Sequence, residues 1–314
     1  MALTIGLPVY NAMPYLPAAV ESILGQTYGD FEFLIVDDDS TDGSTEYLRS
    51  LRDPRITLTV HQNRGLGTAL NELFRNSRTE YVARMDADDV CDPHRLEKQM
   101  GFLRDHPDVV MLGTGIDFMV GNHFANGFLP LTKHDEIRGR LLQKRPGVNH
   151  PTIIVRRDAW EGVGGYHLAR NGEDLDFCLR LCDFGRVTNI PEVLYHYRLH
   201  RKSVTLRNPV ELHRGYAFAV ACARAREQGI PQPELKDFEA AWNERSAWTR
   251  LNEFVSGTGE YLYRTSIIHR AEGRFMRSKA CLLGAAVCRP RVALSRLIEP
   301  QSVGYGIPGT IARR

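Results

Sequence analysis

The sequence lacks the signals of several common protein classes. Its six cysteines form no CxxC pair, and only Cys178 and Cys182 lie close together, four residues apart. A zinc site would need two more ligands at similar spacing, and none is evident. We therefore expect reduced thiols, as in an intracellular protein. No signal-peptide pattern precedes the strand-like run that begins at Leu3.

Long apolar runs and a strong net charge are also missing. The longest apolar run, residues 281–288, is far shorter than the roughly 20 residues that a membrane-spanning helix needs. The net charge of +2 indicates no particular partner, and we expect no nucleic acid. The charge is uneven, however. Residues 206–314 hold 17 Lys and Arg against 10 Asp and Glu, which hints at contact with an anionic surface such as a membrane leaflet.

Glycine-rich phosphate loops are absent as well. Neither GxGxxG nor GxxxxGK[ST] follows the first strand-like run, so both common nucleotide-binding fingerprints are missing. Gly65 and Gly67 form only an isolated pair at the start of a helical pattern. If the protein binds phosphates, a metal ion must therefore hold them.

The first 90 residues alternate between strand and helix patterns. Apolar runs predict strands at 3–8, 31–36, 56–60 and 80–85, and helical spacing predicts helices at 14–26, 44–52 and 65–76. This order predicts a doubly wound, mostly parallel sheet flanked by helices. Ligands of such sheets bind beyond the carboxyl ends of the strands.

Polar residues follow each of these four strands. The segment after the fourth strand, 86–89, places Asp86, Asp88 and Asp89 within four residues. Such closely spaced carboxylates repel one another unless water or a cation neutralises them, and Mg²⁺ and Mn²⁺ prefer oxygen ligands. One alternative is an acidic turn before a helix that starts at Asp92-Pro93.

The last third of the chain has a helical pattern. We expect helices over 211–228, 234–256 and 258–288, with a break at Gly257 and Gly259. The basic amphipathic stretch 289–298 has two interpretations, a helix lying on an anionic membrane or a helix packed on its own domain.

Taken together, the motifs resemble those of family 2 glycosyltransferases, a large inverting group with the GT-A fold. The blocks that carry the resemblance are Leu7-Pro8-Val9-Tyr10-Asn11, Gln26-Thr27-Tyr28, residues 31–44, Asn63-Arg64-Gly65, Asp86-Ala87-Asp88-Asp89, Gly164-Gly165-Tyr166, Glu173-Asp174 and Tyr197-Arg198-Leu199-His200. They cover about residues 1–205. One departure is Asp39, where many members have glycine; aspartate tolerates a left-handed turn better than most residues.

The resemblance implies a site for a nucleoside-diphosphate sugar and Mn²⁺ or Mg²⁺. The residues placed at the donor are Pro8, Val9, Tyr10, Asn11, Asp38, Arg64, Asp86 and Ala87. Asp38 would hydrogen-bond the base, Arg64 would lie near the base or diphosphate, and Asp86 would face the ribose. Asp88 would bind the metal ion, which stabilises the diphosphate leaving group.

The second half of the catalytic domain supplies the remaining candidates. By resemblance Asp174 is the base that deprotonates the acceptor hydroxyl, with Glu173 close by; the alternative is a helix N-terminus favoured by the macrodipole. His200 is a candidate metal or phosphate contact. The alternative is that it belongs to a solvated basic segment that leads out of the domain. His150 is either a pocket residue or a turn histidine bonded to the backbone. Acceptor-side loops are expected within 115–147.

We therefore predict a GT-A catalytic domain over residues 1–205 and a helical C-terminal region over 206–314, which associates with a membrane or a partner protein. The predicted activity is a metal-dependent, inverting hexosyltransferase acting on a saccharide or lipid-linked saccharide in cell-surface polysaccharide or lipopolysaccharide biosynthesis. The predicted location is cytoplasmic, with the option of peripheral contact at the inner face of the membrane. The alternatives are a sugar nucleotidyltransferase and an inactive scaffold that binds saccharide or membrane.

Overall fold

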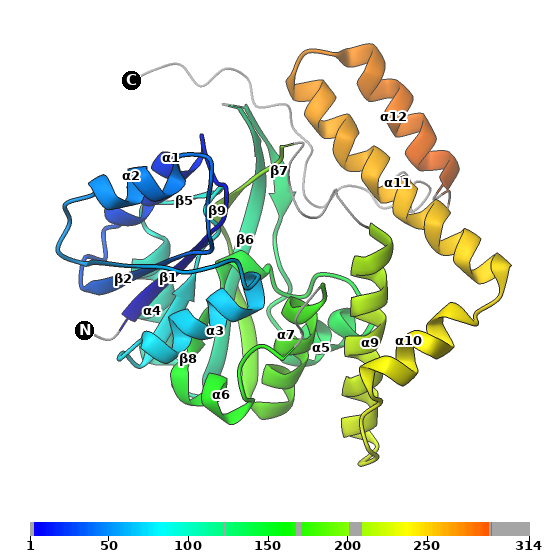
Figure 1. Cartoon of the computed structure of the whole chain (residues 1–314), viewed down its shortest axis with the longest axis horizontal. Coiled ribbons are helices and arrows are strands. Elements are labelled where there is room, and N and C mark those ends of the chain that lie inside the picture. Colours follow the sequence, from blue (N-terminus) through cyan, green and yellow to red (C-terminus); the bar gives the residue numbers. More distant parts are fainter. Residues whose placement is uncertain (1–2, 122, 168–170, 201–208, 289, 291–314) are drawn as a thin grey trace.

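A mixed, mostly parallel sheet organises the chain. The computed structural model describes residues 3–121, 123–167, 171–200, 209–288 and 290. Its strands are β1 (Leu3–Val9), β2 (Phe31–Asp37), β3 (Ile56–Val60), β4 (Tyr81–Arg84), β5 (Val90–Cys91), β6 (Val109–Val120), β7 (His123–Phe128), β8 (Ile154–Arg156) and β9 (Arg186–Arg198). The spatial order is β3-β2-β1-β4-β8-β6-β9-β5, and β7 pairs with β6 (Figure 1).

The first four strands form the predicted parallel half. β1 pairs in parallel with β2 on one side and with β4 on the other, and β3 extends the sheet beyond β2. Their carboxyl ends therefore meet at one edge. β1 continues through Pro8, which pairs in register with Val36, so the strand does not end at the proline. The antiparallel β8 then joins β4 to β6, and β6 runs parallel to β9.

Helices cover both faces of the sheet. They are α1 (Leu16–Leu24), α2 (Ser44–Ser50), α3 (Leu66–Asn76), α4 (Arg95–Asp105), α5 (His134–Leu142), α6 (Arg157–Gly162), α7 (Glu173–Phe184), α9 (Pro209–Glu227), α10 (Leu235–Asn243), α11 (Ala247–Ala271) and α12 (Phe275–Cys288), with a 3₁₀ turn, η1, at His150–Thr152. The helices enclose two hydrophobic cores, and strand residues 31–36 contribute to both. Phe33 and Ile35 are buried in one core, whereas Leu34 and Val36 are buried in the other. A strand buried on both faces is continuously apolar.

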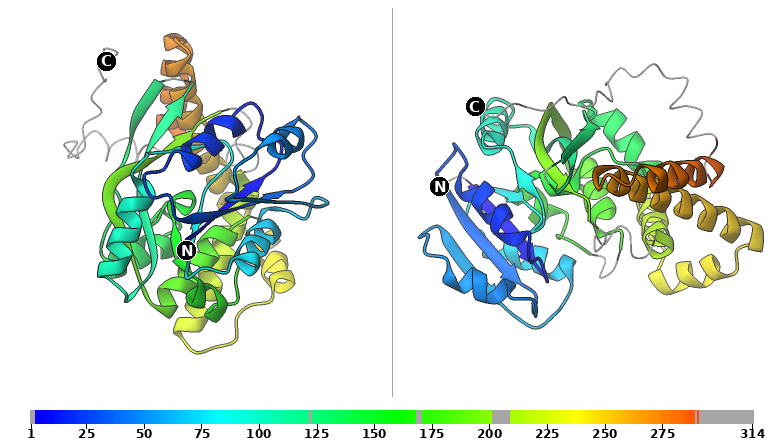
Figure 2. Two further views of the ribbon diagram at one scale, coloured as in Figure 1. Left: turned by 90° about the vertical axis from the view of Figure 1, so that its left-hand side faces the viewer. Right: turned by 90° about the horizontal axis from the view of Figure 1, so that it is seen from above.

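The second core includes part of the C-terminal region. Ala219, Val220 and Ala223 of α9 are buried against the face of α7 that carries Leu175 and Leu179. Beyond α9, helices α10, α11 and α12 extend away from the sheet (Figures 1 and 2). The assignment of functions to 1–205 and 206–314 stays a prediction, but α9 packs as a layer of the catalytic core.

The predicted helix break at Gly257 and Gly259 is wrong, because α11 runs unbroken from Ala247 to Ala271. A glycine inside a helix costs only about 1 kcal/mol and does not end it alone. The actual boundaries carry stronger signals. Ser246 caps the helix by accepting a 3.2 Å hydrogen bond from the Thr249 N–H, and Gly273 follows its end with a φ of 73°.

The six cysteines are all free, as predicted. Among the described residues, no helix is both long and apolar enough to cross a bilayer. The basic stretch 289–298 lies almost wholly outside the described residues, so both of its interpretations stay open.

Candidate active site

The ends of β1 and β2 form a tightly hydrogen-bonded rim. The turn after β1 places Asn11 at a φ of 50°, and the Asn11 side-chain carbonyl accepts a 2.8 Å hydrogen bond from the Thr41 N–H. Asp39 adopts a φ of 71°, the left-handed conformation that the sequence predicted it would tolerate. Tyr10 is 53% exposed beside this rim, so its ring is available to a planar ligand.

Asp38 connects the end of β2 to the loop after β3. Its two carboxylate oxygens accept 2.8 Å hydrogen bonds from the backbone N–H groups of Arg64 and Gly65. Asp38 is only 4% exposed, and Nδ1 of His61 lies 3.2 Å from its Oδ1. The structure thus brings two predicted donor residues, Asp38 and Arg64, into contact. It shows that Asp38 positions the loop; its contact with a base stays a prediction.

The acidic segment after β4 forms a compact cluster. Ligand oxygens of Asp86, Asp88 and Asp89 all lie within 4.8 Å of one another. Burial and the neighbouring Asp88 raise the pKa of Asp86, although Arg84 beside it acts in the opposite direction. Burial and the two other carboxylates raise the pKa of Asp89 well above its usual value. This electrostatic crowding is what a divalent cation would relieve.

The three carboxylates have different surroundings. Asp89 is 1% exposed, and its oxygens accept hydrogen bonds from the Tyr195 hydroxyl (2.8 Å) and the Arg198 N–H (2.7 Å). Asp86 is paired with the buried Arg84, whose Nη2 lies 2.7 Å from Oδ1. Asp88 keeps 34% of its side chain exposed, more than Asp86 at 26%. Asp88 is therefore the most exposed carboxylate of the cluster, and its role as a metal ligand stays a prediction; the burial of Asp89 supports a structural role for it.

Residues at the end of β9 and just after it contact this cluster. Nε2 of His200 lies 2.8 Å from Oδ2 of Asp88, and Nε of Arg198 donates a 2.6 Å hydrogen bond to the Asp88 carbonyl. The ring of Tyr15 stacks near both, 4.8 Å from the His200 ring centre and 4.8 Å from the Arg198 guanidinium. The two predicted metal ligands, Asp88 and His200, are thus neighbours although they are 112 residues apart in sequence.

The predicted base lies at the N-terminus of α7. Burial raises the pKa of Asp174, and this rise is opposed by hydrogen bonds from the Leu175 N–H (2.8 Å) and the Tyr216 hydroxyl (3.0 Å) and by the charge of Arg84. Burial, reinforced by Asp174, raises the pKa of Glu173 to about 7. Oε2 of Glu173 is buried without a hydrogen-bond partner in the described part of the chain.

Arg84 links the two halves of the site. It is 4% exposed at the end of β4, it pairs with Asp86, and its charge acts on Asp174 and Glu173 as well. His150 also lies in its field: burial and the Arg84 charge lower the pKa of His150 well below its usual value. Nε2 of His150 lies 2.9 Å from the Tyr166 hydroxyl, so His150 is a partly buried histidine with a side-chain partner, and its role in a pocket stays a prediction.

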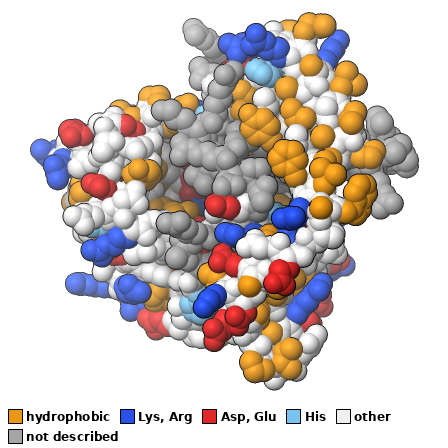
Figure 3. Space-filling view, turned by 45° about the vertical axis from the view of Figure 1, so that its right-hand side comes forward, with side chains coloured by type: hydrophobic (Ala, Val, Ile, Leu, Met, Phe, Trp, Pro, Cys, Tyr) orange, Lys and Arg blue, Asp and Glu red, His pale blue; other side chains and the backbone are white. Residues whose placement is uncertain are grey.

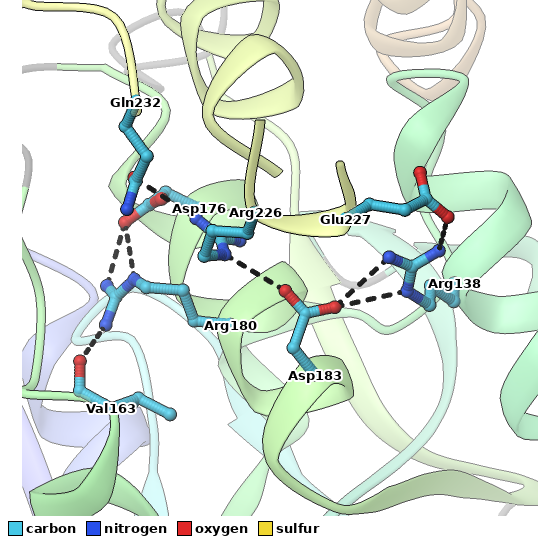
Figure 4. Close-up of polar contacts among 8 residues, drawn as sticks. All are labelled: Arg138, Val163, Asp176, Arg180, Asp183, Arg226, Glu227 and Gln232. Carbon is cyan, nitrogen blue, oxygen red and sulfur yellow. Dashed lines mark hydrogen bonds and ion pairs between the residues drawn. The ribbon is translucent and has the colours of Figure 1, made fainter. Parts of the chain in front are cut away.

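A polar network on the far part of α7 fixes this helix. Asp183 accepts hydrogen bonds from Arg138 of α5 and Arg226 of α9, at 3.2 and 3.0 Å (Figure 4). Asp176 pairs at 2.8 Å with Arg180, which donates a further bond to the Val163 carbonyl. Because α5 and α9 both anchor α7, the Glu173–Asp174 pair sits on a rigid support.

Sequence reasoning missed three residues of the site. Arg84 carried a readable signal, since an arginine inside an otherwise apolar strand needs a buried acidic partner. Tyr195 and Tyr216 carried none, because each reaches the site only through the packing of β9 and α9. The segment 115–147, predicted to hold acceptor loops, instead contains the second half of β6, together with β7 and α5, and its role with an acceptor stays a prediction.

Comparison with known proteins now decides the family. The model of "Glycosyl transferase family 2" matches residues 4–164, about half of the chain. The chain belongs to glycosyl transferase family 2. It is 34% identical over 209 residues to the putative glycosyltransferase EpsE of Bacillus subtilis, covering 60% of this chain and 70% of EpsE. It is 32% identical over 206 residues to the O-antigen biosynthesis glycosyltransferase WbnJ of Escherichia coli, covering 63% and 79%.

A solved structure supports the fold. The mannosyltransferase PcManGT from Pyrobaculum calidifontis, in complex with GDP-Man and Mn²⁺, superposes with a TM-score of 0.53 at 17% identity, covering 96% of this chain and 81% of that one. The predicted GT-A fold, a mostly parallel sheet flanked by helices with C-terminal helices, is confirmed. The family and its glycosyltransferase activity are likewise as the sequence predicted.

Proposed function

We propose that this protein is a divalent-metal-dependent, inverting glycosyltransferase. It transfers a hexosyl group from a nucleoside-diphosphate sugar to a hydroxyl of a saccharide or lipid-linked saccharide. The observation that carries the proposal is the pairing of two acidic groups around Arg84. One is the Asp86–Asp88–Asp89 cluster, and the other is the Glu173–Asp174 pair at the start of α7.

The acidic cluster suits Mn²⁺ or Mg²⁺. Its ligands are carboxylate oxygens, which hard divalent ions prefer, and burial together with the crowding of their charges raises the pKa values of Asp86 and Asp89. Asp88 would hold the ion, with His200 beside it as a metal or phosphate contact. The ion, when bound, supplies positive charge to the departing diphosphate. PcManGT, which shares the fold, carries Mn²⁺ and GDP-Man together.

The donor nucleotide would lie along the rim of strand ends. Tyr10 offers an exposed ring to the base, next to Pro8 and Val9 at the end of β1 and Asn11 in the turn that follows. Asp38 holds the Arg64 loop in place from the opposite side of the rim. Asp86 and Ala87 would contact the sugar part of the nucleotide.

Asp174 would act as the base of a single displacement. The acceptor oxygen attacks the anomeric carbon on the face opposite the diphosphate, and the bond from that carbon to the diphosphate oxygen breaks. The acceptor proton passes to the Asp174 carboxylate, and the anomeric configuration inverts. No covalent enzyme intermediate is required. Burial raises the pKa of Asp174, and the Tyr216 hydrogen bond opposes this rise by favouring the ionised form that accepts a proton.

We place this reaction in cell-surface polysaccharide or lipopolysaccharide biosynthesis, because WbnJ carries the name of an O-antigen biosynthesis enzyme. The enzyme would work in the cytoplasm, in peripheral contact with the inner face of the membrane where lipid-linked acceptors lie.

Calorimetric titration with a panel of nucleotide sugars tests the proposal. We expect one donor to bind in the presence of Mn²⁺, and this binding to be lost with EDTA and in Asp88→Ala. The matched control is Asp105→Ala on α4, whose side chain is 67% exposed and far from the cluster in sequence. Metal-dependent donor binding that persists in Asp88→Ala would refute the assignment of this residue. Retention of the anomeric configuration in the product would refute inversion.

A further inference from the structure

Helix α12 exposes the side chains that a helix normally buries. Its small residues face α11: Ser278 is 4% exposed and Ala285 is 9% exposed. A Cβ atom on Gly284 would lie 2.9 Å from Cδ1 of Leu262, so the two helices approach closely here. The large apolar side chains of the helix are the exposed ones, at 62% for Phe275, 79% for Met276, 69% for Leu283 and 80% for Val287. This reverses the usual amphipathic arrangement.

Three of these exposed side chains share one face of the helix, and Phe275 lies beside it at the N-terminal end. Met276, Leu283 and Val287 are spaced by seven and four residues, which places them on one face, and Lys279 lies between them. Figure 3 shows hydrophobic side chains gathered over the α11–α12 hairpin. Apolar patches of this kind on a soluble protein mark a surface that binds a partner or a membrane.

The charge of α12 restricts what can cover this face. The helix contains Arg277 and Lys279 and no Asp or Glu. Both basic side chains are exposed, and neither has an acidic partner among the residues that the structure describes. The sequence that follows, residues 289–314, adds five arginines and one glutamate.

Like charge therefore disfavours two of the possible occupants. A second copy docked on the same face would bring two sets of Arg277 and Lys279 together. The chain's own residues 289–314 would also add positive charge to a positive face. An anionic lipid surface matches both the apolar side chains and the positive charge of α12, because it takes up the former and attracts the latter.

We propose that α12 is a membrane-docking helix that lies flat on an anionic bilayer. Phe275, Met276, Leu283 and Val287 enter the boundary between headgroups and acyl chains, while Arg277 and Lys279 contact the lipid phosphates. The proposed contact is peripheral: the helix lies on the bilayer and does not cross it. This surface would hold the enzyme where a lipid-linked acceptor lies; only that purpose rests on the proposed function, and the docking itself does not.

Flotation of the full-length protein with vesicles tests the docking. We expect binding to phosphatidylcholine vesicles that contain phosphatidylglycerol, and at least about tenfold weaker binding to phosphatidylcholine alone. The double variant Met276→Ser, Leu283→Ser should lower the partition coefficient about tenfold or more. The matched control is Ile230→Ser, Leu235→Ser, two residues that are 52% and 49% exposed outside α12.

A charge variant distinguishes electrostatic attraction to anionic lipids from nonspecific hydrophobic adsorption. Arg277→Glu, Lys279→Glu should abolish the preference for anionic vesicles, whereas Arg104→Glu, at an 80% exposed side chain of α4, should not. All substituted side chains are exposed, so thermal melting should stay at the wild-type temperature. Donor binding measured on the same samples should also be unchanged, and this keeps the result independent of the transferase assignment.

Two outcomes would overturn the proposal. One is equal vesicle binding by the wild type and the Met276→Ser, Leu283→Ser variant. The other is a wild-type dimer in light scattering that this variant dissociates while vesicle binding persists, because the face would then belong to a second copy.

Discussion

The hydroxyl of Tyr216 on α9 donates a 3.0 Å hydrogen bond to Oδ2 of Asp174 on α7. This bond joins the predicted base of the catalytic domain to a helix that the sequence assigned to a separate C-terminal region. It also opposes the rise in the Asp174 pKa that burial causes, because a hydrogen bond to a carboxylate favours its ionised form.

Replacement of this tyrosine should alter the pH profile of the enzyme. In Tyr216→Phe the carboxylate loses a donor, so its pKa rises and the acidic limb of kcat against pH moves to higher pH. Activity below neutral pH should fall about three- to tenfold, since one pKa unit changes the ionised fraction up to tenfold, and it should recover at alkaline pH. Tyr261→Phe, at a 44% exposed position on α11, is the control. A uniform loss at every pH would indicate a structural role instead.

The two acidic residues of α7 should differ in their effect on transfer. Asp174→Asn should keep Mn²⁺-dependent donor binding and lower kcat about 100-fold or more, because it removes the proton acceptor. Glu173→Gln should keep most of the activity. Single-turnover assays with the donor bound would separate chemistry from binding. If Glu173→Gln abolished transfer and Asp174→Asn did not, the two roles would have to be exchanged.

The raised pKa of Glu173 also predicts a stability effect. Folding raises this pKa from 4.5 to about 7, so the folded state binds more protons than the unfolded state between these values. The free energy of unfolding therefore falls as pH rises from about 4.5 to 7. Glu173→Gln removes the ionisable group and therefore this loss of stability at high pH. Without metal or donor, it should stabilise the protein by about 1–3 kcal/mol at pH 8 and have little effect near pH 4.5.

Thermal melting of the wild type and Glu173→Gln at several pH values measures this effect. Glu161→Gln on α6, with 52% of its side chain exposed, is the control and should show no comparable pH dependence. A constant difference in melting temperature from pH 5 to pH 8 would contradict the assigned pKa.

Local sequence patterns were enough to predict the strand ends and the residues on them. The four parallel strands, their acidic ends and the Glu173–Asp174 pair lie where the alternation of apolar and polar residues indicates. Contacts between distant segments were not readable. His200 meets Asp88 because the end of β9 reaches the segment after β4, and Tyr216 meets Asp174 because α9 packs on α7. Such packing depends on whole faces of helices and strands, which no local spacing encodes.

The C-terminal helices show the same limit. Glycines at 257 and 259 were read as a break, yet α11 continues through them. Large aromatic side chains are usually well buried, whereas Trp248, Phe254 and Tyr261 of this region are 70%, 60% and 44% exposed. Composition predicted the helices, but it could not predict which of their faces would be covered.

The hydroxyl of Tyr195 forms hydrogen bonds with two residues of the acidic cluster. It donates a 2.8 Å hydrogen bond to Oδ2 of Asp89 and accepts a 3.1 Å hydrogen bond from the Asp86 N–H. Tyr195 is completely buried, so Tyr195→Phe leaves both groups without this partner. Each unsatisfied buried group costs about 1–3 kcal/mol, and the melting temperature should fall accordingly.

The same substitution should weaken donor binding, because the turn from Asp86 to Asp89 loses its central constraint and Asp88 is no longer held in position. We expect about tenfold lower affinity for the donor in the presence of Mn²⁺, measured by calorimetry at a temperature where the variant is folded. Tyr47→Phe on α2, a partly buried tyrosine away from the cluster, controls for the loss of a hydroxyl group. A lower melting temperature with unchanged donor affinity would show that Tyr195 stabilises the fold without positioning the metal site.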